Sequence, residues 1–193
     1  MNFFTADSHF SDSDNSVLTR DFRPFDSLSE MNDKIIEIWN KQVKKEDIIY
    51  HLGDFVNYNK IDSNYEHRLK LVKKINAKVV LILGNNEKRI MENDFGGDFN
   101  KFRQYLISCG FFDVYENELS LKIGENEFKL VHYPKDADKN SVYNLFAHIH
   151  NSCFVKRYGF NVGVDNHYFK LFSEDDILEL YTRLEILDEN VYN

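Results

Sequence analysis

The fold is decided by two short apolar stretches, residues 47–54, which read DIIYHLGD, and residues 79–85, which read VVLILGN. Runs this short and this rich in Ile and Val are typical of strands that are buried on both faces of a sheet. A third apolar run, FFTA at residues 3–6, ends directly before Asp7. We therefore predict buried strands at residues 3–6, 47–52 and 79–83.

Helical patterns separate the three predicted strands. Ser27 and Glu30 have the spacing of a capping box, and apolar residues recur with a helical period from there to Val43. A second amphipathic pattern runs from Tyr65 to Ile75, and residues 8–26 form a polar loop before the first helix. Strands that alternate with helices in this way predict parallel pairing with crossover helices.

The second half of the chain carries shorter strands. Residues 118–123 and 127–132 flank a Gly-Glu-Asn turn, which predicts a β-hairpin. We predict further strands at residues 143–147, 153–156 and 160–164, and helices at residues 99–108 and from Ser173 through Leu184. No linker rich in Pro, Gly or Ser divides the chain, so we expect a single α/β domain over residues 1–193.

The composition restricts the class of protein. The chain has 193 residues, 42% of them hydrophobic, with 17 Phe and 11 Tyr, so it has the side chains to bury a core and is not disordered. No apolar run reaches the roughly 20 residues that cross a bilayer, and the first residues lack a signal-peptide pattern, which predicts a cytoplasmic protein without a membrane partner. Cys109 and Cys153 are expected to be ordinary buried thiols, because no CxxC spacing is present.

The charge of the chain bears on its partners. The 24 basic and 32 acidic residues give a net charge of −8. Long nucleic acid is bound by basic side chains that neutralise its phosphates, so we do not expect it as a partner. A small substrate whose phosphate meets a metal ion remains compatible with this charge.

Metal-binding residue types follow each of the three predicted strands. Asp7 and His9 follow the first strand, Asp54 follows the second and Asn85 follows the third. Parallel strands present their carboxyl ends at one edge of the sheet, which is where sites form in open α/β folds. These four side chains are therefore expected to meet.

Three histidines in the second half add to this set. His148 and His150 come after an apolar run, and on a strand alternate residues face the same side, so both imidazoles would reach one site. His132 ends the predicted hairpin, although a single histidine of this kind is more often an ordinary buried residue. Seven Asp, Asn and His residues at strand ends together predict a metal centre.

The order of these residues resembles that of the calcineurin-like metallophosphoesterases, whose motifs run D-x-H, G-D, G-N-H-[DE], H and G-H-x-H. The corresponding segments are, in order, DSH at residues 7–9, GD at 53–54, GNNE at 84–87, His132 and AHIH at 147–150. The resemblance covers roughly Phe3 to Ile177, and further segments are similar to a small bacterial and phage branch of that family. It implies a four-layer αββα sandwich of two mixed β-sheets flanked by helices.

The resemblance also implies two divalent metal ions with a shared carboxylate. One ion would be held by Asp7, His9, Asp54 and His150, and the other by Asp54, Asn85, His132 and His148. Two cations about 3.5–4 Å apart share one hydroxide, lower its pKa and orient it for attack on phosphorus. Imidazole, carboxylate and amide ligands without thiolate suit Mn, Fe, Zn, Co or Ni, and the sequence does not distinguish among them.

One position departs from the family pattern. Asn86 stands where the family has a histidine near the leaving group, and an amide donates a hydrogen bond but cannot transfer a proton near neutral pH. Members of the family that lack this histidine are often phosphodiesterases, so the resemblance implies a phosphodiesterase, and we expect it to act on a small nucleotide-type substrate, such as a cyclic or oligo-nucleotide. Asp54 and Asn86 are the predicted catalytic residues, and Asn85, Asn86 and Arg89 the predicted substrate-binding residues.

Other functions are also compatible with the sequence. A non-catalytic metal-binding scaffold that acts through protein partners, a phosphomonoesterase and a nuclease are all alternatives. Lys88 and Arg89 either meet a substrate phosphate or lie solvated on a loop. Phe10, Phe55 and Tyr133 would form an aromatic wall for a nucleobase if they are not core residues. The oligomeric state is not predicted.

Overall fold

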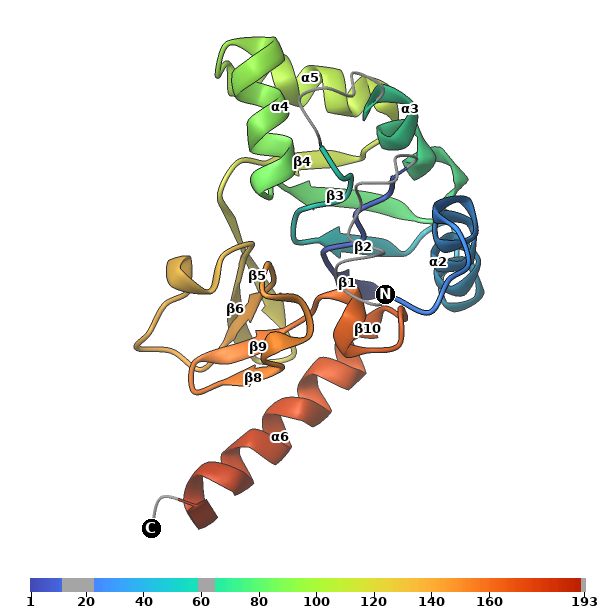
Figure 1. The fold of residues 1–193 in the computed structure, drawn as a ribbon. Helices are drawn as coiled ribbons and strands as arrows, with labels where there is room; N and C mark the ends of the chain where they lie inside the picture. Colours follow the sequence, from blue (N-terminus) through green and yellow to red (C-terminus); the bar gives the residue numbers. More distant parts are fainter. Residues whose placement is uncertain (12–22, 59–64, 192–193) are drawn as a thin grey trace.

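The computed structural model describes residues 1–11, 23–58 and 65–191, with the side chains of the last helix described as far as Arg183. Within these residues the chain forms two five-stranded mixed sheets flanked by helices (Figure 1). The predicted α/β sandwich of two mixed sheets is therefore confirmed. Residues 12–22 of the predicted polar loop lie outside the described residues.

The first sheet has the strand order β10-β1-β2-β3-β4. Its strands are β1 (Asn2–Thr5), β2 (Ile48–His51), β3 (Lys78–Ile82), β4 (Asp113–Tyr115) and β10 (Phe172–Ser173). The first four are parallel, and β10 runs antiparallel to β1. The three long strands lie where the apolar runs predict them. The edge strands β4 and β10 were not predicted, because three and two residues are too few to show a pattern.

The second sheet has the strand order β5-β6-β7-β9-β8. Its strands are β5 (Glu118–Ile123), β6 (Asn126–Val131), β7 (Asn144–Phe146), β8 (Val155–Lys156) and β9 (Gly159–Asn161). Strands β5 and β6 form the predicted hairpin, and β6, β7 and β9 pair in parallel. Their carboxyl ends therefore lie together, as those of the first sheet do.

Five α-helices and four short 3-10 helices connect the strands within the described residues. They are α2 (Leu28–Gln42), α3 (Tyr65–Leu69), η1 (Lys70–Lys74), α4 (Asn85–Phe95), α5 (Phe99–Cys109), η2 (Pro134–Asp136), η3 (His150–Ser152), η4 (Val164–Asn166) and α6 (Glu174–Val191). Ser27 caps α2 as predicted, since its side chain accepts a hydrogen bond from the Glu30 N–H group at 3.1 Å. Helix α4 was not predicted; its first turn was expected to be a loop.

Alternate residues of the first sheet face two different cores. Ile49 and Leu81 face the core that α2 to α5 cover, which includes Trp39. Tyr50 and Val80 face the core between the two sheets. Helix α6 packs its first turns into this second core and then extends away from the body of the molecule (Figure 1).

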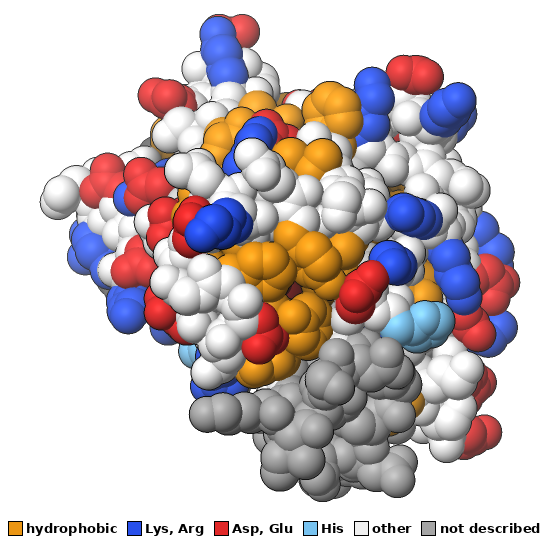
Figure 2. Space-filling view, turned by 90° about the horizontal axis from the view of Figure 1, so that it is seen from above, with side chains coloured by type: hydrophobic (Ala, Val, Ile, Leu, Met, Phe, Trp, Pro, Cys, Tyr) orange, Lys and Arg blue, Asp and Glu red, His pale blue; other side chains and the backbone are white. Residues whose placement is uncertain are grey.

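The face over α3 to α5 carries several half-buried rings. Tyr65, Phe95, Phe99 and Tyr105 pack against the first core without being fully covered. Seen from above, this side of the molecule shows a group of hydrophobic side chains surrounded by charged ones (Figure 2). Over the part of the chain that the structure describes, no helix combines the length and the apolar character needed to cross a membrane.

Candidate metal centre

The loops after β1 and β2 run side by side beyond the end of the sheet. The N–H group of Asp7 donates to the Gly53 carbonyl oxygen at 3.0 Å, and that of His9 donates to the Asp54 carbonyl oxygen at 3.0 Å. These bonds continue the parallel pairing of β1 with β2 past the last strand residues. They hold the Asp7 and His9 side chains beside that of Asp54.

Backbone strain is concentrated in the predicted metal ligands. Asp7, His9, Asp54, His148 and His150 have φ angles of 56°, 49°, 54°, 75° and 49°. The left-handed region is uncommon for residues other than glycine, and residues held there cluster at functional sites. The fold therefore forces these five side chains into directions that regular strands would not give them.

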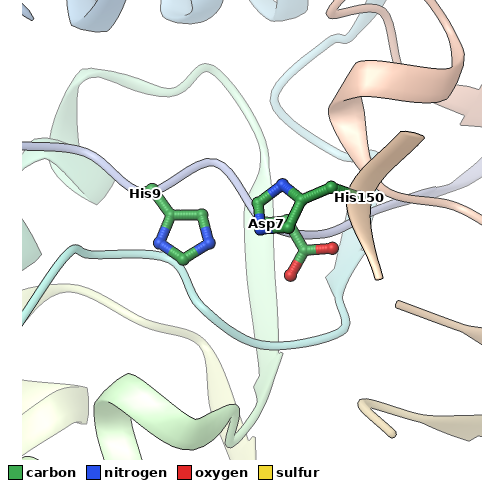
Figure 3. Close-up of side chains that lie close together, drawn as sticks. All are labelled: Asp7, His9 and His150. Carbon is green, nitrogen blue, oxygen red and sulfur yellow. The ribbon is translucent and has the colours of Figure 1, made fainter. Parts of the chain in front are cut away.

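The first group of possible ligands is Asp7, His9 and His150, whose ligand atoms lie within 4.8 Å of one another (Figure 3). The two imidazole rings stack with centroids 5.0 Å apart. Asp7 is fully buried, and its Oδ1 atom has no hydrogen-bond partner among the described residues. Burial raises the pKa of Asp7 well above its usual range. A cation bound in this group would supply the positive counter-charge that stabilises the ionised form of the buried Asp7 carboxylate.

The second group is Asp54, His132 and His148, again with ligand atoms within 4.8 Å of one another. Asp54 stands between the two groups. Its Oδ2 atom lies 3.6 Å from His9 Nε2, and its Oδ1 atom lies 3.7 Å from His132 Nε2. This carboxylate therefore has one oxygen toward each group, which is one of the arrangements in which a carboxylate can bridge two metal ions.

His148 and His150 both reach the site around Asp54, but not through strand alternation, the reason on which that prediction was based. Strand β7 ends at Phe146, and the left-handed backbone at His148 and His150 turns the chain sharply on either side of Ile149. As a result His148 joins Asp54 and His132, whereas His150 joins Asp7 and His9. The two histidines belong to different groups, in the division that the family resemblance implies.

His132 and Asn85 face each other in a way that fits a cation. The His132 Nδ1 atom lies 2.7 Å from the Leu52 carbonyl oxygen, which only accepts, so Nδ1 carries the proton. The other nitrogen, Nε2, lies 3.2 Å from the Asn85 Oδ1 atom. Two lone pairs at this distance repel each other unless a positive charge lies near both. Burial lowers the pKa of His132 to about 4, so a proton does not supply that charge near neutral pH.

A buried ion pair supports His150 from behind. The His150 Nδ1 atom donates to Asp165 Oδ2 at 2.8 Å, and Arg23 donates from Nε to Asp165 Oδ1 at 2.8 Å. Arg23 also donates to the carbonyl oxygens of Asp7 and Ser8, at 2.7 and 2.8 Å. A carboxylate on the far nitrogen of a ligating histidine fixes its tautomer and raises its basicity. Neither Arg23 nor Asp165 was predicted as a site residue, because a contact between residues 142 positions apart leaves no local pattern in the sequence.

Glu87 is a third residue whose role was not predicted. Its buried carboxylate accepts hydrogen bonds from the N–H groups of Asp54, Phe55, Val56 and Gly84, at 2.8 to 3.2 Å. It thereby ties the loop after β2 to the start of α4. The signal that could have identified it is a glutamate at the third position of a helix that follows a glycine.

The comparisons with known proteins agree with this geometry. The sequence model of the calcineurin-like phosphoesterases matches residues 3–191. The chain belongs to the calcineurin-like phosphoesterase family. Uncharacterized protein MJ1445 of Methanocaldococcus jannaschii is 33% identical over 87 residues, which are 45% of this chain and 46% of that protein. The match thus spans about half the length of this relative.

Two solved structures are similar to the chain. The crystal structure of AQ665, a protein of unknown function from Aquifex aeolicus, has a TM-score of 0.64 at 22% identity, covering 93% of this chain and 98% of that one. This likeness shows a shared fold. A novel archaeal phosphodiesterase has a TM-score of 0.48 at 19% identity, covering 84% of this chain and 81% of that one.

Membership in the calcineurin-like phosphoesterase family agrees with the presence of two candidate metal-binding groups among the described residues. The family histidine that Asn86 replaces would lie on α4. Asn86 is only 4% exposed, and its side-chain oxygen accepts a hydrogen bond from the Tyr58 N–H group at 3.1 Å. Its backbone N–H group donates to Asp54 Oδ1 at 2.9 Å. Asn86 is therefore a buried neighbour of Asp54 and not part of a surface loop.

The calcineurin-like site opens into a cleft of about 1250 Å³. Arg89 lines it from α4, which corrects the prediction of a loop at this position, and Lys156 lines it from β8. Tyr133 also lines the cleft. Phe10 and Phe55 do not, because both are fully buried in the first core, so for these two residues the core alternative holds and the aromatic wall does not form.

The two thiols differ in their surroundings. Cys109 is buried on α5, as predicted. Cys153 is only partly buried and lines the cleft, so the prediction of a buried thiol is wrong there. Burial raises the pKa of the Cys109 thiol.

Proposed function

We propose that this protein is a two-metal-dependent phosphodiesterase that hydrolyses a small nucleotide-type phosphodiester, such as a cyclic or oligo-nucleotide. One ion would be held by Asp7, His9 and His150, and the other by Asn85, His132 and His148, with Asp54 between them. Family membership supports the hydrolase class. The number of metal ions, the diester preference and the substrate class are the parts that we propose.

The observation that carries the proposal is the position of Asp54. Its two oxygens lie 3.6 and 3.7 Å from histidine nitrogens of the two different groups. No other described carboxylate faces both groups in this way. A buried carboxylate with a raised pKa and ligands on both sides supports a bridging role.

The protein residues would bind and orient the phosphoester. Divalent ions at this centre would lower the pKa of a water molecule and offset the negative charge that develops on the phosphoryl oxygens. Arg89, at the wall of the cleft, would donate to a phosphoryl oxygen as a planar cation. Burial raises the pKa of Asp54, and hydrogen bonds from the backbone and side chain of Asn86 oppose that rise, so Asn86 favours the ionised carboxylate.

The proposed preference for diesters rests on the residue at position 86, because family members with no histidine at this position are often phosphodiesterases. An asparagine has no proton to give to a leaving group near neutral pH. The site is therefore suited to esters whose leaving group needs little acid assistance. Asn85 and Asn86 both line the cleft, where their amides would contact the substrate.

The test compares bis-p-nitrophenyl phosphate with p-nitrophenyl phosphate on the protein reconstituted with Mn²⁺. We expect faster turnover of the diester and loss of both activities in Asp54→Asn. Lys45→Ala, an exposed substitution before β2 at the opposite end of the sheet, is the control and should keep both. Faster turnover of the monoester would overturn the diester preference. Tight metal binding without turnover of either ester would favour the scaffold alternative.

A further inference from the structure

A second hollow of about 530 Å³ adjoins the cleft. It shares Tyr133, His148 and Lys156 with the cleft, so the two spaces meet at the metal centre. Its remaining walls include Lys135, which follows Pro134 on η2, and Lys139. Three lysines therefore line a space that opens beside the predicted ligand His148.

These lysines differ in their ion pairing from five other lysines of the described surface. Lys34, Lys41, Lys70, Lys74 and Lys101 each pair with a carboxylate within 3.3 Å. Lys135, Lys139 and Lys156, in contrast, form no ion pair with any described residue. An ammonium group without a carboxylate neighbour keeps its full charge for a ligand.

Aromatic rings hold two of the three ammonium groups in place. Lys135 Nζ lies 4.8 Å from the ring centroid of Tyr133, and Lys139 Nζ lies 3.6 Å from that of Tyr158. Lys139 Nζ also donates to the Pro134 carbonyl oxygen at 2.6 Å. A cation–π contact positions an ammonium group without neutralising its charge. Lys135 and Lys139 are therefore held in place by these contacts and stay electropositive.

The hollow has no acidic side chain in its walls. Two carboxylates occur in the same segment, Asp136 and Asp138, but neither lines the space. Asp138 Oδ1 accepts a hydrogen bond from the Asn140 N–H group at 2.9 Å. The chain as a whole has a net charge of −8. Three lysines without carboxylate partners therefore make this opening locally positive on an acidic protein.

We infer that this hollow, formed by Lys135, Lys139, Lys156 and the rings of Tyr133 and Tyr158, is a subsite for a second phosphate group of the substrate. The inference rests on the proposed function, since the scissile phosphate must lie at the metal centre for a second one to reach the lysines. It names the substrate class more closely, as a phosphodiester that carries an additional phosphate group.

The test uses two esters with the same scissile bond. One is the p-nitrophenyl ester of thymidine monophosphate, and the other carries a second phosphate on the remaining sugar hydroxyl. Water adds to phosphorus and p-nitrophenolate leaves in both, so the released colour measures the same step. We expect kcat/KM of the Mn²⁺-loaded protein to be roughly tenfold higher for the ester with the second phosphate, the effect of one good charge-assisted contact.

The variant Lys139→Ala/Lys156→Ala should bring the ratio of the two kcat/KM values close to one, whereas Lys45→Ala should leave it unchanged. Added salt should lower the ratio of the unmodified protein, because screening weakens the second-phosphate contact. Hydrolysis of both esters at equal rates would overturn the subsite and leave the proposed function standing. Failure to hydrolyse either ester would overturn the proposed function and this inference with it. A preference that persists in the double variant would also overturn the subsite.

Discussion

Gly53 and Gly84 pack backbone against backbone at the edge of the metal centre, where a Cβ atom on Gly53 would lie 2.6 Å from the Cα atom of Gly84. A Cβ atom on Gly84 would lie 2.3 Å from both the backbone nitrogen and the Oδ1 atom of Asp54. The loops after β2 and β3 approach this closely only because neither residue has a side chain. The position of Asp54 between the two histidine groups thus depends on two glycines.

Gly84→Ala is therefore expected to displace Asp54. The added methyl group meets backbone and a buried carboxylate, which cannot move aside, so we expect a loss of about 1–3 kcal/mol in the free energy of unfolding. Mn²⁺ affinity, measured by titration calorimetry, should fall as well. Gly96→Ala is the control, because a Cβ atom there meets nothing within 4 Å, although its φ of 63° adds strain. Unchanged Mn²⁺ affinity in Gly84→Ala would contradict the proposed role of Asp54.

Asp165→Asn should weaken metal binding without removing a predicted ligand. The amide keeps an acceptor for the His150 ring but loses the charge that pairs with buried Arg23 at 2.8 Å. Removing the outer partner of a ligating histidine costs on the order of 10–100-fold in metal affinity. Asp113→Asn is a matched control, because it removes a carboxylate that pairs with Arg103 at 2.6 Å elsewhere on the molecule. If both variants bound Mn²⁺ equally well, Asp165 would have no positioning role.

The metal-free protein should lose stability as the pH rises to about 8, the pKa to which burial raises Asp7 and Glu87, and this loss should level off above that pH. Burial raises the pKa values of Asp7 and Glu87, so the folded chain holds protons that the unfolded chain has already released. The free energy of unfolding then falls with rising pH, by at most about 1.4 kcal/mol per pH unit for each group. His132, whose pKa burial lowers to about 4, acts in the opposite direction, but only below its unfolded value of about 6.5.

Urea denaturation between about pH 7 and pH 8, in EDTA and in Mn²⁺, measures this effect above the range of the histidines. Metal ions should reduce the slope, because a bound cation replaces the proton on Asp7. Asp7→Asn should reduce the slope in EDTA. A metal-free protein whose stability does not fall over this range would show that Asp7 and Glu87 are already ionised.

The sequence predicted the parts of the fold that have strong local signals. Buried strands such as β2 and β3 are visible as apolar runs that end at glycine, because both faces of a parallel sheet are covered. Helix α4 was missed because its sequence, NNEKRIMENDF, is mostly polar and contacts the core mainly through Ile90 and Met91. Its first turn is stabilised by Glu87 and not by an apolar stripe.

The composition of the candidate site was easier to predict than its geometry. The order of residue types along the chain was enough to predict the seven Asp, Asn and His residues. The structure places them in two groups that meet at Asp54. The division of His148 from His150 depends on left-handed backbone angles, which no periodicity predicts. Contacts between distant segments, such as Arg23 with Asp165 across 142 positions, have no local signal at all.

Asn86→His tests whether acid assistance is what this site lacks. Position 86 is beside Asp54 and at the wall of the cleft, so an imidazolium there would lie near a leaving group. A positioned general acid contributes about 10²–10⁴-fold when the leaving group is poor, and much less when it is good. We therefore expect at least about a tenfold gain in kcat/KM for thymidine monophosphate, whose leaving group is an alkoxide, and little gain for p-nitrophenyl phosphate.

The pH profile separates proton transfer from a change in packing. The gain in Asn86→His should decline as the pH rises past about 6.5, where an imidazole loses its proton. Asn86→Gln keeps an amide and is the control, with no gain on either ester. An equal gain on both monoesters, or one that does not vary with pH, would mean that the histidine binds the phosphate and does not protonate the leaving group. The diester preference would then need a cause other than the missing acid.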